Sequence, residues 1–361
     1  MILREELTMK IRLAILEKDK SYLTRIVSAF GARYSDKLEI YSFTDYYVAM
    51  ATLDSAKIEV FIANDAFDVD VSALPRRCGF AYLVDSMDID TVNDQRAICK
   101  FKKADLIYKQ ILSIYSENAG NVSGLKIGDE SSRIIAFASP SGGSGSSTMA
   151  AGCALHYAAR GKKTLYLNLE KFGASDCFFS AEGQFDMSDV IFALKSKKTN
   201  LSLKLESCVK MDPRGVNFFA PSKIALDMLE LTTEDVLRLL SELKVTGSYD
   251  YIILDLDFAL DKNMLSIYRQ AHCVVAVGDG SAISNTKITR AFTALTTMEQ
   301  NADAPLAGRL ALAYNKFSNK TSTNIGDIGI RVVGGAPRYE HATTEQVVNQ
   351  LATMDFYDKF I

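Results

Sequence analysis

Short apolar runs alternate with stretches of helical periodicity along the first 115 residues. The apolar runs cover residues 11–16, 38–43, 60–63 and 80–84. Apolar residues recur at helical spacing in residues 21–30 and 104–115. Short buried strands that alternate with helices are typical of a parallel sheet. We therefore predict a small α/β domain over residues 1–120.

The same alternation continues through the second half of the chain. Apolar segments there cover residues 133–138, 164–169, 216–219, 251–256, 273–277, 310–314 and 330–333. They predict a doubly wound α/β domain with a mostly parallel sheet over residues 133–361. The polar, glycine-containing stretch between the halves is predicted to be a linker, at residues 121–132.

Composition narrows the expected cellular compartment and the expected classes of binding partner. A chain of 361 residues is long enough for two domains. With 41 Lys and Arg against 44 Asp and Glu, it has no overall charge that favours nucleic acid or anionic lipid. The six cysteines form no metal-binding or disulfide pattern, and no apolar stretch reaches about 18 residues. We expect a cytoplasmic protein with no nucleic-acid partner and no direct membrane insertion.

A glycine-rich segment follows the strand predicted at residues 133–138 and precedes an Ala-rich helical segment. It reads Ser141-Gly142-Gly143-Ser144-Gly145-Ser146-Ser147-Thr148. Backbone N–H groups of such a loop, and of the helix N-terminus after it, converge on phosphate oxygens. Glycines allow the close approach and the unusual dihedral angles that this requires. Residues 142–148 are therefore predicted to bind phosphate.

This loop resembles the deviant Walker A motif of the ParA/MinD family of P-loop ATPases, K-G-G-x-G-K-[ST]-[ST]. Both lysines of that motif are serine in this chain, at Ser141 and Ser146. The resemblance implies ATP and Mg²⁺ as cofactors, with Ser147 as the hydroxyl ligand of Mg²⁺. Loss of the lysines removes charge stabilisation that is made mainly in the transition state. We expect ATP to bind and to be hydrolysed slowly or not at all.

Two carboxylates match further motifs of the family. Glu170 lies where the family has the second acid of a D-x-D strand end, which serves the attacking water, and Asn168 replaces the first acid. Glu170 either keeps a weakened form of that role or is a solvated carboxylate at a strand end; the sequence leaves both open. Asp255 ends a strand of the Walker B type. The resemblance implies that Asp255 holds Mg²⁺ through a water molecule.

The predicted base-binding residues follow two later strands. By resemblance, Asn315 reads the adenine edge, Lys316 follows it, and the turn at Pro337 and Arg338 packs against the base. If the protein is an active ATPase, another cation has to replace the motif lysine, and the candidates are Lys171, Lys316 and Arg338.

The order of motifs around Ala220-Pro221 resembles the CpaE/TadZ branch of the family, which carries a receiver-like domain before the ATPase domain. At the corresponding place, Asn64 stands in the position of the phosphate-accepting Asp. Glu17 and Asp19 flank Lys18, and Ser86 with Lys102 or Lys103 would complete the pocket. These substitutions favour a degenerate receiver used for docking over a phosphorylated one.

The resemblance implies an ATP-binding localisation and assembly factor of a tight-adherence (Flp) type IV pilus secretion system. Nucleotide would stabilise a homodimer or one conformation, and proteins of the pilus machinery would recruit it to a cell pole or the inner membrane. The alternatives are an active ParA/MinD-like positioning ATPase, of the partition or cell-division type, and a response regulator with a protein-binding output. Residues 345–361 contain acidic side chains, and we expect them to pack against the ATPase core.

Overall fold

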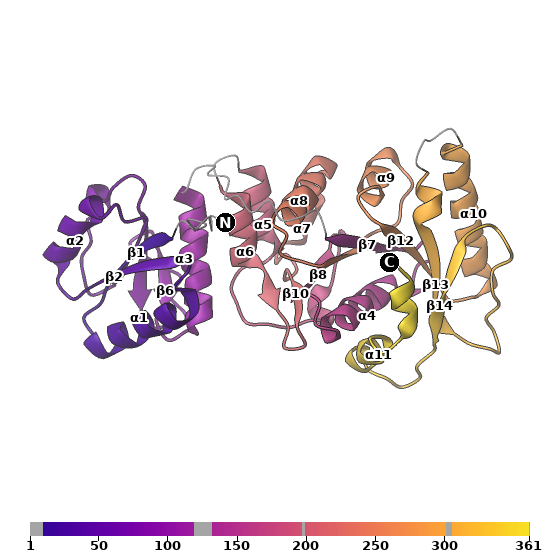
Figure 1. The fold of residues 1–361 in the computed structure, drawn as a ribbon, viewed down its shortest axis with the longest axis horizontal. Helices are drawn as coiled ribbons and strands as arrows, with labels where there is room; N and C mark the ends of the chain where they lie inside the picture. Colours follow the sequence, from indigo (N-terminus) through magenta and orange to yellow (C-terminus); the bar gives the residue numbers. More distant parts are fainter. Residues whose placement is uncertain (1–9, 119–131, 197–198, 301–304, 361) are drawn as a thin grey trace, which may run out of the picture. The chain divides into compact units, whose positions relative to one another are not determined.

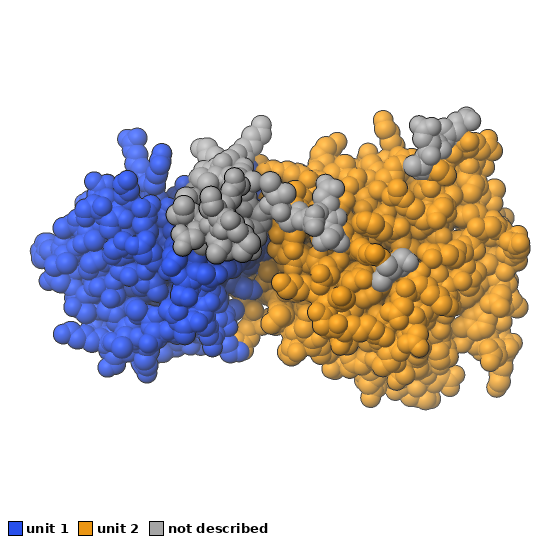
Figure 2. Space-filling view, viewed as in Figure 1, with its two compact units in different colours: residues 1–124, 196–208 blue, residues 125–195, 209–361 orange. Residues whose placement is uncertain are grey.

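The computed structural model describes residues 10–118, 132–196, 199–300 and 305–360. It contains two compact units, which Figure 2 shows in different colours. Unit 1 comprises Met1–Gly124 and Ser196–Cys208; unit 2 comprises Leu125–Lys195 and Val209–Ile361. The predicted linker at 121–132 lies outside the described residues except for Ser132.

Unit 1 is built on a sheet with the strand order β2-β1-β3-β4-β6-β5 (Figure 1). The first five strands in this order pair in parallel, and β5 pairs antiparallel with β6. The prediction of a parallel sheet is confirmed. The strands are β1 (Ile11–Leu16), β2 (Leu38–Phe43), β3 (Val60–Asn64), β4 (Gly79–Val84), β5 (Thr91–Val92) and β6 (Gln95–Cys99).

Helices cover both faces of this sheet. Ile11, Leu13 and Ile15 pack with α1 and α3 on one face, while Ala14 and Leu16 pack with α2 on the other. This is the alternation that a strand imposes on successive side chains. The elements are α1 (Lys20–Tyr34), α2 (Tyr46–Ser55), α3 (Ala104–Asn118) and the short 3₁₀ turn η1 (Val71–Ala73).

A helix from the second half of the sequence completes unit 1. Helix α6 (Leu201–Cys208) packs against α3, and the buried Lys204 donates from Nζ to Ser113 Oγ at 2.7 Å. The backbone N–H of Asn200 donates to the Ser116 carbonyl at 2.9 Å. Lys37 and Glu206 form an exposed ion pair. Unit 1 thus depends on a segment that lies more than 80 residues beyond α3 in the sequence.

Unit 2 contains a sheet with the order β14-β13-β12-β7-β11-β8-β10-β9. All neighbours pair in parallel except β9, which is antiparallel to β10. The doubly wound arrangement predicted for the second half is confirmed. The strands are β7 (Arg133–Ala138), β8 (Thr164–Asn168), β9 (Lys210–Met211), β10 (Val216–Phe218), β11 (Tyr251–Asp255), β12 (Cys273–Gly278), β13 (Leu310–Phe317) and β14 (Arg331–Pro337).

Figure 1 shows α4 and α11 on one face of this sheet and α8, α9 and α10 on the other. Ile135, Phe137 and Val275 belong to the core on the α4 face. The helices are α4 (Ser146–Ala159), α5 (Met187–Lys195), α7 (Ala225–Leu229), α8 (Thr233–Val245), α9 (Lys262–Tyr268), α10 (Ala282–Met298) and α11 (Thr344–Leu351), with 3₁₀ turns η2 (Ser175–Cys177), η3 (Leu306–Arg309) and η4 (Asp355–Phe360).

The C-terminal segment packs against α4, as the sequence predicted. The Tyr357 hydroxyl donates to the Met149 carbonyl at 2.9 Å, and Tyr357 and Leu351 are buried. A side chain at Gly152 would meet both of them, at 2.7 Å each. Glycine at this position therefore lets the C-terminal segment lie directly on the helix. Among the described helices, none is both long and apolar enough to span a membrane.

Candidate functional site

The glycine-rich loop joins the central strand β7 to the N-terminus of α4. Gly143 and Gly145 have φ values of 76° and 87°, in the left-handed region that favours glycine. A Cβ atom at Gly145 would lie 2.4 Å from Asn315 Nδ2, whereas a Cβ at Gly142 or Gly143 would meet no atom within 4 Å. The loop is therefore held closely on one side and is open at Gly142 and Gly143. With the N–H groups at the start of α4, it forms a backbone cradle suited to an anion.

Strand order brings the predicted carboxylates to this loop. Strand β11 lies between β7 and β8, so Asp255 pairs in register with Phe137 on one side and Asn168 on the other. The carboxyl ends of parallel strands share one edge of a sheet, which is where ligands bind in open α/β folds. Asp255 and Glu170 are thereby placed beside the start of α4.

Hydrogen bonds join these side chains into one cluster. Asn168 Nδ2 donates to Asp255 Oδ2 and to Glu170 Oε2, both at 3.0 Å. The Tyr166 hydroxyl donates to Asp255 Oδ2 at 2.7 Å, and the Ser147 hydroxyl donates to Glu170 Oε2 at 3.3 Å. The cluster thus brings together the three residues that the sequence assigned to Mg²⁺ and catalysis: Ser147, Glu170 and Asp255.

Asp255 has no accessible surface, and it forms no ion pair within the described part of the chain. Burial, and then the charge of Glu170, raises the pKa of Asp255 to about 8, although Tyr166 and Ser147 act in the opposite direction. Its Oδ1 atom is buried without a hydrogen-bond partner among the described residues, and so is Ser146 Oγ. Unsatisfied buried oxygens are costly, so this part of the site is suited to a cation or a hydrogen-bonding ligand.

The residues predicted to bind the base fall into two groups. Asn315 is buried and donates from Nδ2 to the Ser144 carbonyl at 2.9 Å, and Lys316 donates from Nζ to the Gly143 carbonyl at 2.8 Å. Both therefore contact the loop itself. Pro337 pairs with Phe317 one strand further out, and the Arg338 backbone N–H donates to the Phe317 carbonyl at 3.2 Å. Thr148 lies in the first turn of α4.

Sequence reasoning missed Tyr166. This residue is fully buried, and its hydroxyl makes the shortest hydrogen bond to Asp255 among those recorded. The signal was its position two residues before Asn168, because alternate residues of a strand share a face. A buried tyrosine hydroxyl needs a polar partner, and the cluster supplies one.

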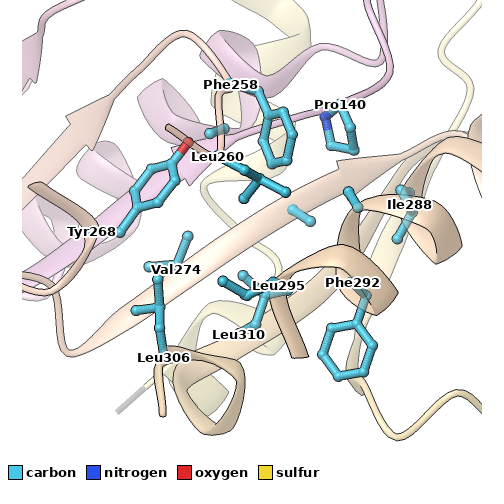
Figure 3. Close-up of a pocket in the computed structure, with 13 residues that line it drawn as sticks. Pro140, Phe258, Leu260, Tyr268, Val274, Ile288, Phe292, Leu295, Leu306 and Leu310 are labelled. Atoms are coloured by element: carbon cyan, nitrogen blue, oxygen red, sulfur yellow. The ribbon is translucent and has the colours of Figure 1, made fainter. Parts of the chain in front are cut away.

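An apolar pocket is lined in part by Pro140, which directly precedes the glycine-rich loop (Figure 3). Phe258 and Leu260, which follow β11, line it together with side chains of α9, β12 and α10. The Tyr268 hydroxyl is the one polar side-chain group among the lining residues. This pocket is unsuited to phosphate, and burial of its lining anchors the segment after Asp255.

Unit 1 has its own polar pocket at the carboxyl ends of β1, β3 and β6. Glu17 is buried, and Asn64 Nδ2 donates to Glu17 Oε2 at 3.2 Å. Lys100 Nζ lies 3.8 Å from Glu17 Oε2 and 2.6 Å from Asp85 Oδ1. Burial lowers the pKa of Lys100, but its hydrogen bond to Asp85 and the charge of Glu17 outweigh this and raise it. Lys100 is therefore a charged partner of the buried acid.

Lys100 lies in the pocket position for which the sequence analysis named Lys102 or Lys103 as the lysine. It directly follows β6, a strand that was not predicted because polar residues interrupt its apolar pattern. Asn64 ends β3, where a receiver has its phosphate-accepting Asp, and an amide has no carboxylate oxygen to accept a phosphoryl group. Ser86 Oγ accepts from the Asp88 backbone N–H at 3.2 Å.

Comparison with known proteins adds to this geometry. A family model described as the TadZ-like receiver domain matches residues 9–116. Unit 1 contains a TadZ-like receiver domain. The polar pocket with the buried pair of Glu17 and Lys100 lies within the matched residues.

Solved structures similar to the chain have ParA/MinD folds. A ParA family ATPase from Chlorobium tepidum is 19% identical over 64% of this chain and 96% of its own, with a TM-score of 0.50. MinD in a MinC:MinD cell division complex from Aquifex aeolicus is 18% identical over 63% and 93%, with a TM-score of 0.49. MinD complexed with Mg-ADP from Pyrococcus horikoshii is 17% identical over 61% and 94%, with a TM-score of 0.46. A search of curated proteins gave no match. Alongside the TadZ-like receiver domain, the chain therefore has the P-loop fold of the ParA family ATPase.

Proposed function

We propose that this protein is an ATP-binding localisation and assembly factor of a tight-adherence (Flp) pilus secretion system. In this proposal residues 1–120 form the docking domain and residues 133–361 bind ATP and Mg²⁺. The observation that carries it is a backbone phosphate cradle without its motif lysines, in a chain whose first domain is of the TadZ-like receiver type.

The described residues fit a nucleotide and a divalent cation. The open glycines and the N-terminus of α4 provide N–H donors for phosphate, and the Ser146 hydroxyl there lacks a partner. Ser147 supplies a hydroxyl beside Glu170, and Asp255 has a buried oxygen that lacks a partner. No group of three or more His, Cys, Asp or Glu side chains in the described part of the chain forms a metal site. A divalent cation bound here would therefore need oxygen ligands from the nucleotide, as Mg²⁺ has when it binds together with phosphate groups.

The same residues favour slow or absent hydrolysis of ATP. Bound Mg²⁺ would supply charge neutralisation to the phosphates. Glu170 accepts from both Ser147 and Asn168 at the same oxygen, Oε2, so these bonds weaken the basicity of the carboxylate that a general base would use. Neither Ser141 nor Ser146 brings positive charge to the transferring group. ATP would act as a ligand that favours one conformation or a homodimer, since a ligand stabilises the state to which it binds best.

Two experiments test this function. Calorimetric titration of the full chain with ATP and Mg²⁺ should show saturable binding, while phosphate release stays near background; absence of binding up to millimolar ATP would overturn the nucleotide part. Fast phosphate release that Glu170→Ala abolishes would support the active positioning ATPase instead.

The pilus role is tested in the organism that encodes the chain. Deleting the gene should abolish assembly of Flp pili and leave plasmid partition and septum placement unchanged. Normal piliation together with misplaced septa or lost plasmids would overturn the pilus role. Complementation with the Asp255→Ala variant would show whether the nucleotide site is needed for assembly.

A further inference from the structure

Strand β13 ends in two successive side chains that both contact the phosphate loop. Asn315 Nδ2 donates to the Ser144 carbonyl and Lys316 Nζ donates to the Gly143 carbonyl, at 2.9 and 2.8 Å. Successive side chains of a regular strand point to opposite faces. In a regular strand end these two side chains would leave from opposite faces, and only one of them would face the loop directly.

The local backbone explains how both side chains reach the loop. The pairing of β13 with β14 shifts register between Tyr314 and Phe317, and Lys316 has a φ of 55°. This left-handed conformation is unfavourable for a lysine. Irregularities of this kind re-aim side chains and are common beside active sites. Here the irregular strand end turns the Lys316 side chain toward the glycine-rich loop.

The loop lacks cations at the two positions where its motif would have them. Ser141 and Ser146 are uncharged, and the next candidates are Lys171, Lys316 and Arg338. The recorded hydrogen bonds of Lys171 and Arg338 come from their backbone N–H groups, to Asp257 and Phe317. Lys316 is the candidate whose ammonium group contacts the loop.

We propose that Lys316 provides, from strand β13, the positive charge that Ser141 and Ser146 do not bring to bound polyphosphate. This inference rests on the proposed nucleotide binding and specifies the residue that favours a triphosphate over a diphosphate. An exposed ammonium on a flexible stem can exchange its bond to the Gly143 carbonyl for a phosphate oxygen. Asn315, buried and neutral, keeps the loop in place during that exchange.

The test compares Lys316→Met, Lys316→Arg and the control Lys320→Met in the full chain. Lys320 is an exposed lysine in the turn after β13. Calorimetry measures the dissociation constants of ATP, ADP and adenosine with Mg²⁺ at two salt concentrations. Lys316→Met should weaken ATP binding roughly ten- to a hundredfold, as expected for losing one hydrogen bond to a charged group, and ADP binding less. Adenosine binding should be unchanged, and the salt dependence of ATP binding should decrease.

The other variants separate charge from loop support. Lys316→Arg should retain most of the ATP affinity, and Lys320→Met should match the wild type. Equal ATP binding by Lys316→Met and wild type would overturn the inference and leave the proposed function standing. Equal weakening of ATP and adenosine would also overturn it, because Lys316 would then only support the loop. If the wild type itself binds no ATP, the proposed function fails, and the inference with it.

Discussion

Replacing Asp255 by Asn should stabilise the ligand-free protein above neutral pH. The carboxyl is fully buried, and its pKa is about 8 against an ordinary 3.8. Below pH 3.8 the folded and unfolded chains both carry the proton, so this carboxyl has no effect on stability. Between pH 3.8 and about 8 the unfolded chain loses the proton while the folded chain keeps it, so stability falls as pH rises.

The size of this effect follows from the two pKa values. The difference between 3.8 and about 8 corresponds to about 6 kcal/mol, at about 1.4 kcal/mol for each pKa unit. Between pH 5 and pH 8 the carboxyl should therefore remove up to about 4 kcal/mol of stability. Asn has nearly the same shape and keeps an oxygen that can accept from Tyr166 and Asn168. The Asp255→Asn protein should lose this pH dependence.

Hydrogen exchange of peptides from β7 and β11 measures the effect locally, which matters because the two units need not unfold together. Exchange is recorded at pH 5, 6.5 and 8 and corrected for the intrinsic rates. Asp257→Asn is the matched control, since Asp257 is an exposed carboxylate two residues away. Equal protection in Asp255→Asn and wild type at pH 8 would refute the reasoning, as would a variant that is less stable there.

Three further predictions concern other parts of the molecule. Gly145→Ala should destabilise unit 2 and abolish ATP binding, because its Cβ would lie 2.4 Å from an amide nitrogen and its φ is 87°; Gly308→Ala, at an open position of unit 2 outside the glycine-rich loop, is the calorimetric control. Lys100→Met should lower the stability of unit 1 by about 3 kcal/mol, since it leaves a buried charge unpaired, and adding Glu17→Gln should restore most of the loss in thermal unfolding. Acetyl phosphate should leave residues 1–120 unlabelled by mass spectrometry because Asn64 cannot accept phosphate; stoichiometric labelling there would contradict this.

Hydrophobic patterning was sufficient to predict most strands of both sheets. The segments at 11–16, 38–43 and 133–138 correspond to β1, β2 and β7 residue for residue. Strands β1 and β7 are largely buried and apolar, so local sequence carries their signal, and the edge strand β2 keeps enough apolar residues to show it although most of its side chains are not buried. Strand β6 was missed because Gln95 and Arg96 open it, and β9 because it is only two residues long.

Contacts between distant segments could not be predicted in this way. Helix α6 follows a stretch of unit 2 in the sequence, and nothing in its pattern indicated that it packs on α3 of unit 1. Lys316 could be named only as one of three candidate cations, because its contact with Gly143 depends on the irregular end of β13. That Asn315 reads adenine stays a prediction, and its contact with the Ser144 carbonyl was not foreseen because it depends on tertiary placement rather than on residue type.

The two polar pockets differ in how they balance buried charge, and this difference predicts which of them responds to a divalent cation. In unit 1 the ammonium of Lys100 lies 3.8 Å from the buried Glu17, so that pocket gains little from a metal ion. In unit 2 Asp255 lies beside a second acid, Glu170, and keeps an oxygen without a partner. A divalent cation would therefore compensate the negative charge of the acids in unit 2. In unit 1 it would have to compete with the ammonium group of Lys100 for Glu17. Protection by Mg²⁺ against hydrogen exchange should accordingly appear in β11 and be absent from β1 and β3.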